Sequence, residues 1–185
     1  MTSNQTFKPM TMPRIDRATA FIDRHAMSHN IKIAQSISPS AKITAVVKAN
    51  GYGHGMLNTA TILSPYVHGY AVARFEEAQT LRANGISHEI LVMSPTNNLK
   101  QLQHYPPNNF IVAVHTKEML EVAKCLPELN YWIKVDTGMH RLGIDAASLD
   151  SLLVQEPVKN PPKALMTHFS ESQKKHSIAT QKQLN

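Results

Sequence analysis

Residues Ala45–Gly55 have the sequence AVVKANGYGHG, in which a short apolar run leads into one lysine and then into a glycine-rich turn. We expect Lys48 at the end of a buried strand, where the loss of water favours the uncharged amine. A free amine suits a Schiff base with an aldehyde cofactor. The glycines let the backbone approach a ligand closely, and we expect Tyr52 and His54 at the mouth of the pocket. A lysine at a strand end more often extends into solvent, so the interpretation of Lys48 as a cofactor lysine depends on the residues around it.

The composition is that of an ordinary globular domain, with 185 residues of which 42% are hydrophobic and 17% charged. This length can bury one core, and no apolar run approaches the ~20 residues that span a bilayer. We expect residues 1–15 to form a loose leader and residues 16–185 to form the folded domain. The single cysteine, Cys125, excludes an internal disulfide and fits a reducing, cytoplasmic location.

The net charge of +6 reflects scarce acidic residues, 13 in all, and not a basic stripe. Only Lys174 and Lys175 are adjacent among the basic residues, so we expect no nucleic-acid partner. His25 and His29 have the spacing of metal ligands on a helix, but no glutamate or third ligand lies nearby. We therefore expect both side chains in solvent, and no metal site.

Short apolar strands alternate along the chain with amphipathic helices. The expected strands are 43–48, 69–73, 90–93, 110–114, 131–135 and 164–167. The expected helices are 22–37, 57–63, 76–83, 116–125, 148–154 and 170–185. The strands are continuous apolar runs, which is typical of parallel strands covered by helices. An open doubly wound sheet and part of a barrel are both compatible with this pattern.

A second block, residues 133–143, has the sequence IKVDTGMHRLG. It places Lys134 near a strand end and Arg141 beyond a glycine turn, on the face where barrel enzymes gather their active sites. A plain ion pair between Lys134 and Asp136 is the simpler interpretation of that pair. Together with residues 45–55, the block resembles the lysine and arginine motifs of the alanine racemase family, whose pattern Lys-x-Asp-Thr-Gly-Met-x-Arg-Leu-Gly is matched throughout.

The resemblance implies an α/β fold, a parallel TIM-type (β/α) barrel of which about six of the eight strand-helix units are present. In the family a mainly β domain follows the barrel, and we expect it to be absent here. The implied cofactor is pyridoxal 5'-phosphate. The implied site residues are Lys48 and Arg141 as catalytic and cofactor-binding groups, Tyr52, Met93 and His168 as cofactor-binding groups, and Lys134 as a lysine that is often carbamylated.

The implied activity is interconversion of L- and D-alanine for cell-wall precursors by a cytoplasmic homodimer with no membrane partner. We expect this chain to be inactive alone, because the second proton-transfer tyrosine and the phosphate-binding loops would lie beyond Asn185. The alternatives are another pyridoxal-phosphate barrel enzyme, a non-catalytic binding or interaction protein, and a product with no stable fold. Single-domain pyridoxal-phosphate homeostasis proteins lack the Gly-Tyr-Gly-His-Gly turn. Departures from the family are small: Gly51 replaces a common alanine, and His140 a small residue.

Overall fold

A computed structural model describes residues 20–95, 110–154 and 159–184, and the expected leader at residues 1–15 lies outside these ranges. One parallel sheet forms the centre of the described structure. Its strands are β1 (Thr44–Val46), β2 (Gly69–Val72), β3 (Glu89–Val92), β4 (Phe110–Val114), β5 (Tyr131–Asp136), β6 (Ile144–Asp145) and β7 (Ala164–Met166).

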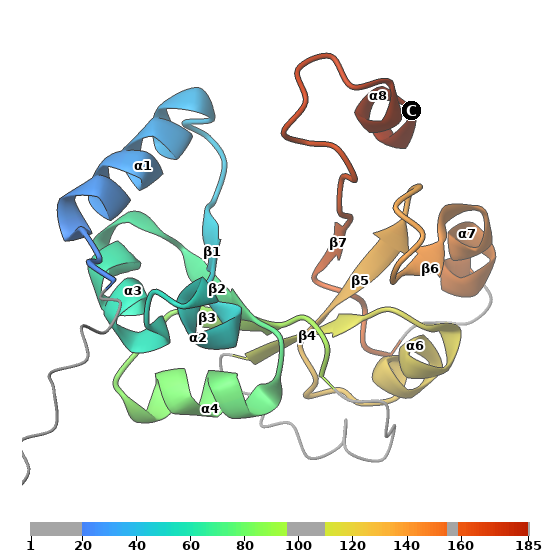
Figure 1. Cartoon of the computed structure of the whole chain (residues 1–185). Coiled ribbons are helices and arrows are strands. Elements are labelled where there is room, and N and C mark those ends of the chain that lie inside the picture. The colour runs from blue at the N-terminus through green and yellow to red at the C-terminus, as the bar shows by residue number, and fades with distance from the viewer. Residues whose placement is uncertain (1–19, 96–109, 155–158, 185) are drawn as a thin grey trace, which may run out of the picture.

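The strands follow one another in chain order from β1 to β5, and β7 then pairs with β5. The short strand β6, which the sequence did not predict, pairs with the last two residues of β5. Every pairing is parallel. Strands β1 and β7 lie at the two ends of the sheet and do not pair with each other within the described residues (Figure 1). The predicted parallel α/β architecture is therefore confirmed, as an open sheet.

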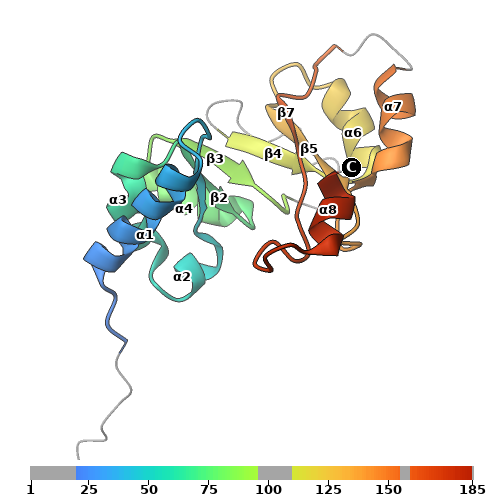
Figure 2. The same cartoon turned by 90° about the horizontal axis from the view of Figure 1, so that it is seen from above.

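The helices gather on the outer side of this sheet, as Figures 1 and 2 show for α3, α4, α6 and α7. The helices are α1 (Arg24–Ile37), α2 (Lys48–Tyr52), α3 (Met56–Leu63), the 3-10 helix η1 (Ser64–Tyr66), α4 (Phe75–Ala83), α6 (Lys117–Lys124), α7 (Ala146–Val154) and α8 (Ile178–Leu184). As predicted, Thr116 caps α6 by accepting a hydrogen bond from Met119 N at 3.2 Å. No helix among the described residues is both long and apolar enough to cross a membrane.

Alternating side chains divide the core between the two faces of the sheet. The outer face carries the larger cluster, in which Val72, Val92, Val112 and Ile133 are fully buried against the helices. The inner face carries a smaller cluster of Ala71, Leu91, Ile111 and Ala113, with Met93, Trp132 and Met166 packed against it. Strands β2 and β4 are buried at every position, which confirms the expectation from their continuous apolar runs. The inner cluster forms the floor of the site described below.

Three sequence predictions need correction. Strand β1 is not buried: Val46 is 41% exposed, because β1 is an edge strand that pairs only with β2 among the described residues. Helix α1 forms as predicted but buries no residue, since it packs on the surface through half-buried positions such as Ile31. The predicted helix 170–185 begins only at Ile178, after a segment of turns.

Candidate functional site

A cavity of about 520 Å³ opens on the inner face of the sheet, toward the carboxyl ends of the strands. Its walls come from residues two apart on successive strands, because alternate side chains share one face. The lining residues are Thr44, Val46, Lys48, Tyr52, Ala71, Ala73, Leu91, Met93, Ser94, Trp132, Lys134, Arg141, Leu142, Met166 and His168. Six of the seven residues that the sequence placed at the site, all except His54, therefore line one cavity.

Lys48 enters the cavity from a turn of unusual handedness. Ala49, Asn50, Gly51 and Tyr52 have φ of 50°, 55°, 62° and 52°, so the backbone makes one left-handed helical turn directly after the lysine. A left-handed conformation costs about 1–2 kcal/mol for a residue with a Cβ. The side chain of Asn50 helps to hold the turn, because its Oδ1 accepts a hydrogen bond from Met56 N at 3.0 Å.

The carboxylate of Glu77 on α4 anchors this turn to the neighbouring strand. Its Oε1 accepts a hydrogen bond from Ala49 N at 2.7 Å, and its Oε2 accepts hydrogen bonds from Ala73 N at 2.8 Å and Arg74 N at 3.0 Å. Hydrogen bonds to a charged acceptor are stronger than neutral ones. One carboxylate therefore fixes the backbone next to Lys48 relative to the end of β2.

Lys48 itself is half-buried, and its Nζ lies 6.0 Å from the centre of the Tyr52 ring. Tyr52 is 60% exposed and lines the cavity, as expected for a residue at its mouth. His54 does not line the cavity, contrary to the prediction. Its Nδ1 lies 3.1 Å from the carbonyl oxygen of Gly51, because the left-handed turn directs this ring back onto its own backbone.

Lys134 lies on β5 and is only 7% exposed. Burial lowers the pKa of its amine, the positive charge of Arg141 lowers it further, and Asp136 acts in the opposite direction. The simple ion pair between Lys134 and Asp136 is not formed in the described structure. The Asp136 carboxylate instead accepts hydrogen bonds from Gly138 N at 2.9 Å and His140 N at 3.0 Å, and these bonds lower its pKa.

The loop that carries Arg141 folds tightly over the end of β5. Asp136 holds its first half through the two backbone hydrogen bonds, and His140 adopts φ of 55° to close it. Gly143 closes the second half with φ of 143°, and a Cβ there would lie 2.6 Å from Asp136 N. Only glycine can pass this close to another backbone, so the glycine of the motif fixes the path by which Arg141 reaches the cavity.

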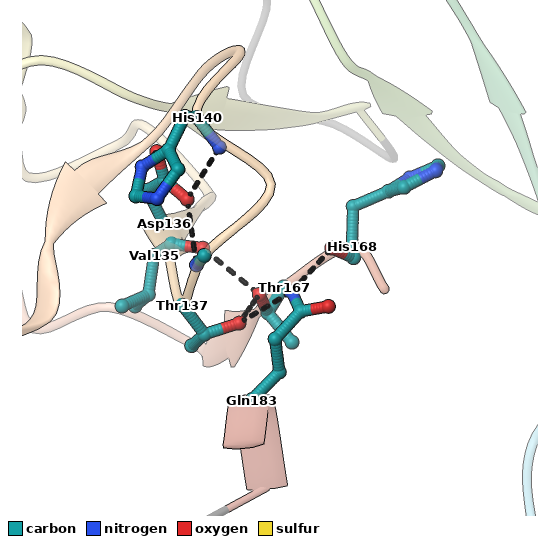
Figure 3. A network of polar contacts seen from close by, with 8 residues as sticks. Val135, Asp136, Thr137, His140, Thr167, His168 and Gln183 are labelled. Atoms are coloured by element: carbon teal, nitrogen blue, oxygen red, sulfur yellow. Dashed lines mark hydrogen bonds and ion pairs between the residues drawn. The ribbon is translucent and has the colours of Figure 1, made fainter. Parts of the chain in front are cut away.

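His168 follows β7, the strand that pairs with β5, and lines the cavity from there. Burial lowers the pKa of its imidazole, and the positive charges of Arg141, Lys134 and Lys48 lower it further. The backbone around it belongs to a network of polar contacts that also includes Thr137 and Gln183 (Figure 3). The neutral imidazole is therefore favoured at neutral pH.

Three cationic side chains, Lys48, Lys134 and Arg141, meet in this cavity, and no carboxylate is among its described lining residues. Like charges brought together without a counterion are costly, and an anion entering the cavity relieves that cost. The guanidinium of Arg141 offers planar donors to such an anion, whereas a lysine amine in its neutral form is a nucleophile. The site is thus suited to an anionic ligand with a reactive carbonyl group.

Sequence reasoning missed His115, Glu77 and Gln183. His115 is 8% exposed, its Nδ1 has no hydrogen-bond partner among the described residues, and burial lowers its pKa. The register that pairs Val114 with Ile133 places His115 beside Lys134 on the inner face. Extending the predicted strand 110–114 by one residue would have placed His115 at the site. Glu77 and Gln183 gave no such signal, because glutamate and glutamine on amphipathic helices normally face solvent.

Comparison with known proteins agrees with the geometry. Residues 22–185 match the family described as "Alanine racemase, N-terminal domain". The alanine racemase of Haemophilus influenzae is 40% identical over 174 residues, which are 91% of this chain and 48% of that protein. The crystal structure of the biosynthetic alanine racemase of Pseudomonas aeruginosa superimposes with a TM-score of 0.76 at 31% identity, covering 88% of this chain and 47% of that one.

A histidine racemase from Leuconostoc mesenteroides shares the fold alone, with a TM-score of 0.76 at 24% identity over 87% of this chain and 45% of that one. The chain spans about half the length of the curated relatives that it matches. Because the family match covers most of the chain, from the first helix to its last residue, the chain belongs to the alanine racemase family.

Proposed function

We propose that this chain supplies the pyridoxal-phosphate site of an amino-acid racemase whose substrate is alanine. The observation that carries the proposal is the convergence of Lys48, Lys134 and Arg141 in a cavity with no carboxylate among its described lining residues. Pyridoxal phosphate combines an aldehyde with an anionic phosphate and a phenolic oxygen, and the cavity offers an amine and cationic donors. The residues present therefore fit the cofactor.

Lys48 is the covalent anchor in this proposal. Its Nζ is the primary amine that would hold the cofactor, because an amine condenses with an aldehyde with the loss of one water molecule. Arg141 donates hydrogen bonds to the phenolic oxygen and to the substrate carboxylate, since its guanidinium stays charged and planar. His168, in its neutral form, lies against the ring, and Tyr52 and Met93 form the walls. The resemblance to the family implies these roles, and the placement of the side chains along one cavity is compatible with them.

The bound cofactor supplies the electron sink that stabilises the carbanion formed when the α-proton leaves. Lys48 Nζ would accept that proton on one face of the α-carbon. A racemase also needs a group on the opposite face that returns a proton there. The resemblance assigns that second group to a tyrosine of a partner subunit, so the experiment below measures binding and not turnover.

The experiment is titration of the purified chain with pyridoxal phosphate, followed by absorbance spectroscopy. We expect a long-wavelength band typical of the cofactor joined to a lysine, which disappears in Lys48→Ala. Lys42→Ala, at an exposed position, serves as the matched control. Borohydride reduction and peptide mass spectrometry should then place the cofactor on Lys48. Equal spectra for the wild-type chain and Lys48→Ala would contradict the proposal.

Alanine is proposed as the substrate because the relatives that combine high coverage of this chain with high identity are alanine racemases. The histidine racemase shares only the fold, so the fold alone does not choose the side chain of the substrate. The alternative is a protein that binds pyridoxal phosphate without catalysis. In that case a longer protein that contains this unit should show the Lys48-dependent band and no turnover. The homodimer, the cytoplasmic location and the absence of a nucleic-acid partner stay predictions.

A further inference from the structure

Gln183 is the buried residue of helix α8, whose other residues are half-buried or exposed, and it is 9% exposed. Its amide makes hydrogen bonds to three residues on two segments, and Figure 3 shows those to Thr137 and His168. The Nε2 group donates to Thr137 Oγ1 at 3.1 Å and to the carbonyl oxygen of His168 at 3.0 Å. The Oε1 atom accepts from Ser170 N at 3.0 Å and from Ser170 Oγ at 3.1 Å. The amide thus joins the start of the Arg141 loop to the segment of His168.

The chemistry of the partners fixes the orientation of this amide. A backbone N–H can only donate, so the group that faces Ser170 N must be the oxygen of Gln183. A backbone carbonyl can only accept, so the group that faces the carbonyl of His168 must be the nitrogen. The positions of the amide oxygen and of the amide nitrogen are therefore each determined by a partner that can only donate or only accept a hydrogen bond.

The hydroxyl groups of Thr137 and Thr167 continue the hydrogen-bond network from Gln183 to β5. Thr167 Oγ1 donates to the carbonyl oxygen of Val135 at 3.0 Å, which uses its single proton. The 2.7 Å contact between the two hydroxyls is therefore donated by Thr137, whose own lone pair accepts from Gln183. Hydrogen bonds run from Gln183 through both threonines into the backbone of β5.

Gln183 also packs against the loop that it bonds. A Cβ added to Gly138 would lie 3.4 Å from Gln183 Cγ, which is ordinary van der Waals distance, so the glutamine packs closely against this loop. Asp136 holds the same loop from the other side through Gly138 N and His140 N. The segment that leads to Arg141 is thus confined between Asp136 and Gln183.

We propose that Gln183 is a positioning residue, which aligns the loop of Arg141, after β5, with His168, after the neighbouring strand β7. This inference rests on the proposed function, in which Arg141 and His168 contact the same cofactor and must therefore be aligned. Gln183 does not line the cavity and so acts only through Thr137 and the backbone of His168. Two walls that belong to different strands keep a constant separation because one amide spans them.

The test uses Gln183→Glu, which has the same shape, keeps the acceptor for Ser170 and loses both donors. Gln183→Met removes the polar group at similar volume. Gln181→Glu and Gln181→Met are the matched controls, because Gln181 lies exposed on the same helix. Circular dichroism establishes that each variant is folded. Two readouts follow: hydrogen exchange of residues 137–143 and 168–170 in the chain alone, and the dissociation constant for pyridoxal phosphate from its absorbance.

We expect Gln183→Glu to increase exchange in both segments and to weaken pyridoxal-phosphate binding about tenfold, while the Gln181 variants match the wild type. Unchanged exchange and affinity in Gln183→Glu would overturn the inference. Faster exchange with unchanged affinity would overturn it as well, since it leaves a role in stability only. If Gln183→Met does not fold, Gln183→Glu decides.

The failure of the proposed function has a different signature. There the wild-type chain and Lys48→Ala would bind the cofactor equally. The exchange experiment needs no cofactor, so its result does not depend on that outcome: exchange in Gln183→Glu equal to that of Gln181→Glu overturns the alignment even if Lys48 does not hold the cofactor.

Discussion

The carboxylate of Glu77 accepts a hydrogen bond from the backbone N–H of Ala49, with 2.7 Å between Oε1 and N. The second oxygen of the same group receives the N–H groups of Ala73 and Arg74. The turn that presents Lys48 and the end of β2 therefore share one anchor. Glu77 lies on a helix and does not line the cavity, but its carboxylate determines the position of Lys48.

Glu77→Gln should destabilise the chain by about 1–3 kcal/mol, because the amide NH2 would face a backbone N–H that is left without an acceptor. Pyridoxal-phosphate binding should weaken as well, since the Lys48 turn loses its anchor. Urea unfolding and cofactor titration measure the two effects. Glu76→Gln, at the neighbouring exposed position, is the control. Equal unfolding midpoints for both variants would show that the Glu77 anchor contributes nothing.

Gly143→Ala should cost about 3 kcal/mol or more of stability, because its Cβ would meet the backbone of β5 at 2.6 Å and cannot be accommodated by a side-chain movement. Gly85→Ala provides the comparison: φ is +84° there, but no atom lies within 4 Å of the added Cβ. The second variant should therefore cost only the conformational strain, about 1–2 kcal/mol. Thermal and urea unfolding of both variants give the difference, and similar losses would refute the clash.

Lys134 should form a carbamate in bicarbonate buffer. Burial and Arg141 lower the pKa of Lys134, so more of its amine is neutral and able to attack carbon dioxide. The nitrogen bonds the carbon and releases one proton to solvent, which leaves a carboxylate-like group beside Arg141. Carbon-13 NMR in labelled bicarbonate should show a carbamate signal that is absent from Lys134→Gln and retained in Lys42→Gln. A signal that persists in Lys134→Gln would exclude this site.

His115 should make stability fall as the pH is lowered. Burial holds the pKa of His115 below its ordinary value of 6.5, so the unfolded chain binds more protons between the lowered pKa and 6.5. The free energy of unfolding therefore rises with pH through that window and is smaller at pH 5 than at pH 7. His115→Gln should reduce this slope without abolishing it, because the pKa of His168 is lowered too.

Urea unfolding at both pH values measures the slope, with His29→Gln at an exposed position of α1 as control. A slope equal to that of the wild type in His115→Gln would mean that His115 is protonated with little cost in the folded chain.

The sequence predicted the strands well where burial is two-sided. The runs that became β2 and β4 are apolar at every position because one face meets the helices and the other faces the inner cluster. The motifs also predicted which side chains share the cavity, since parallel strands bring their carboxyl ends to one edge. Strand β6 was missed because two residues, Ile144 and Asp145, carry no periodic signal.

Other features depend on contacts that no local pattern encodes. Gln183 is polar in a polar segment, and only the arrival of Thr137 and His168 from distant strands makes it a buried group. The edge position of β1 likewise depends on which strands pair, and this left Val46 more exposed than its apolar run indicated. Glu77 occupies an ordinary first-turn position of α4, so its bond to Ala49 could not be inferred from its helix.

The turn after Lys48 has the backbone conformation that is natural to D-amino acids. Ala49 at φ of 50° has its Cβ where an L-residue meets the following carbonyl, and a D-alanine at the same φ would avoid that contact. Chemical synthesis of the chain with D-alanine at position 49 should therefore stabilise the fold, whereas the same replacement in a right-handed helix would weaken it. The mirror-image preference extends over four successive residues of this turn, which lies next to the reactive amine.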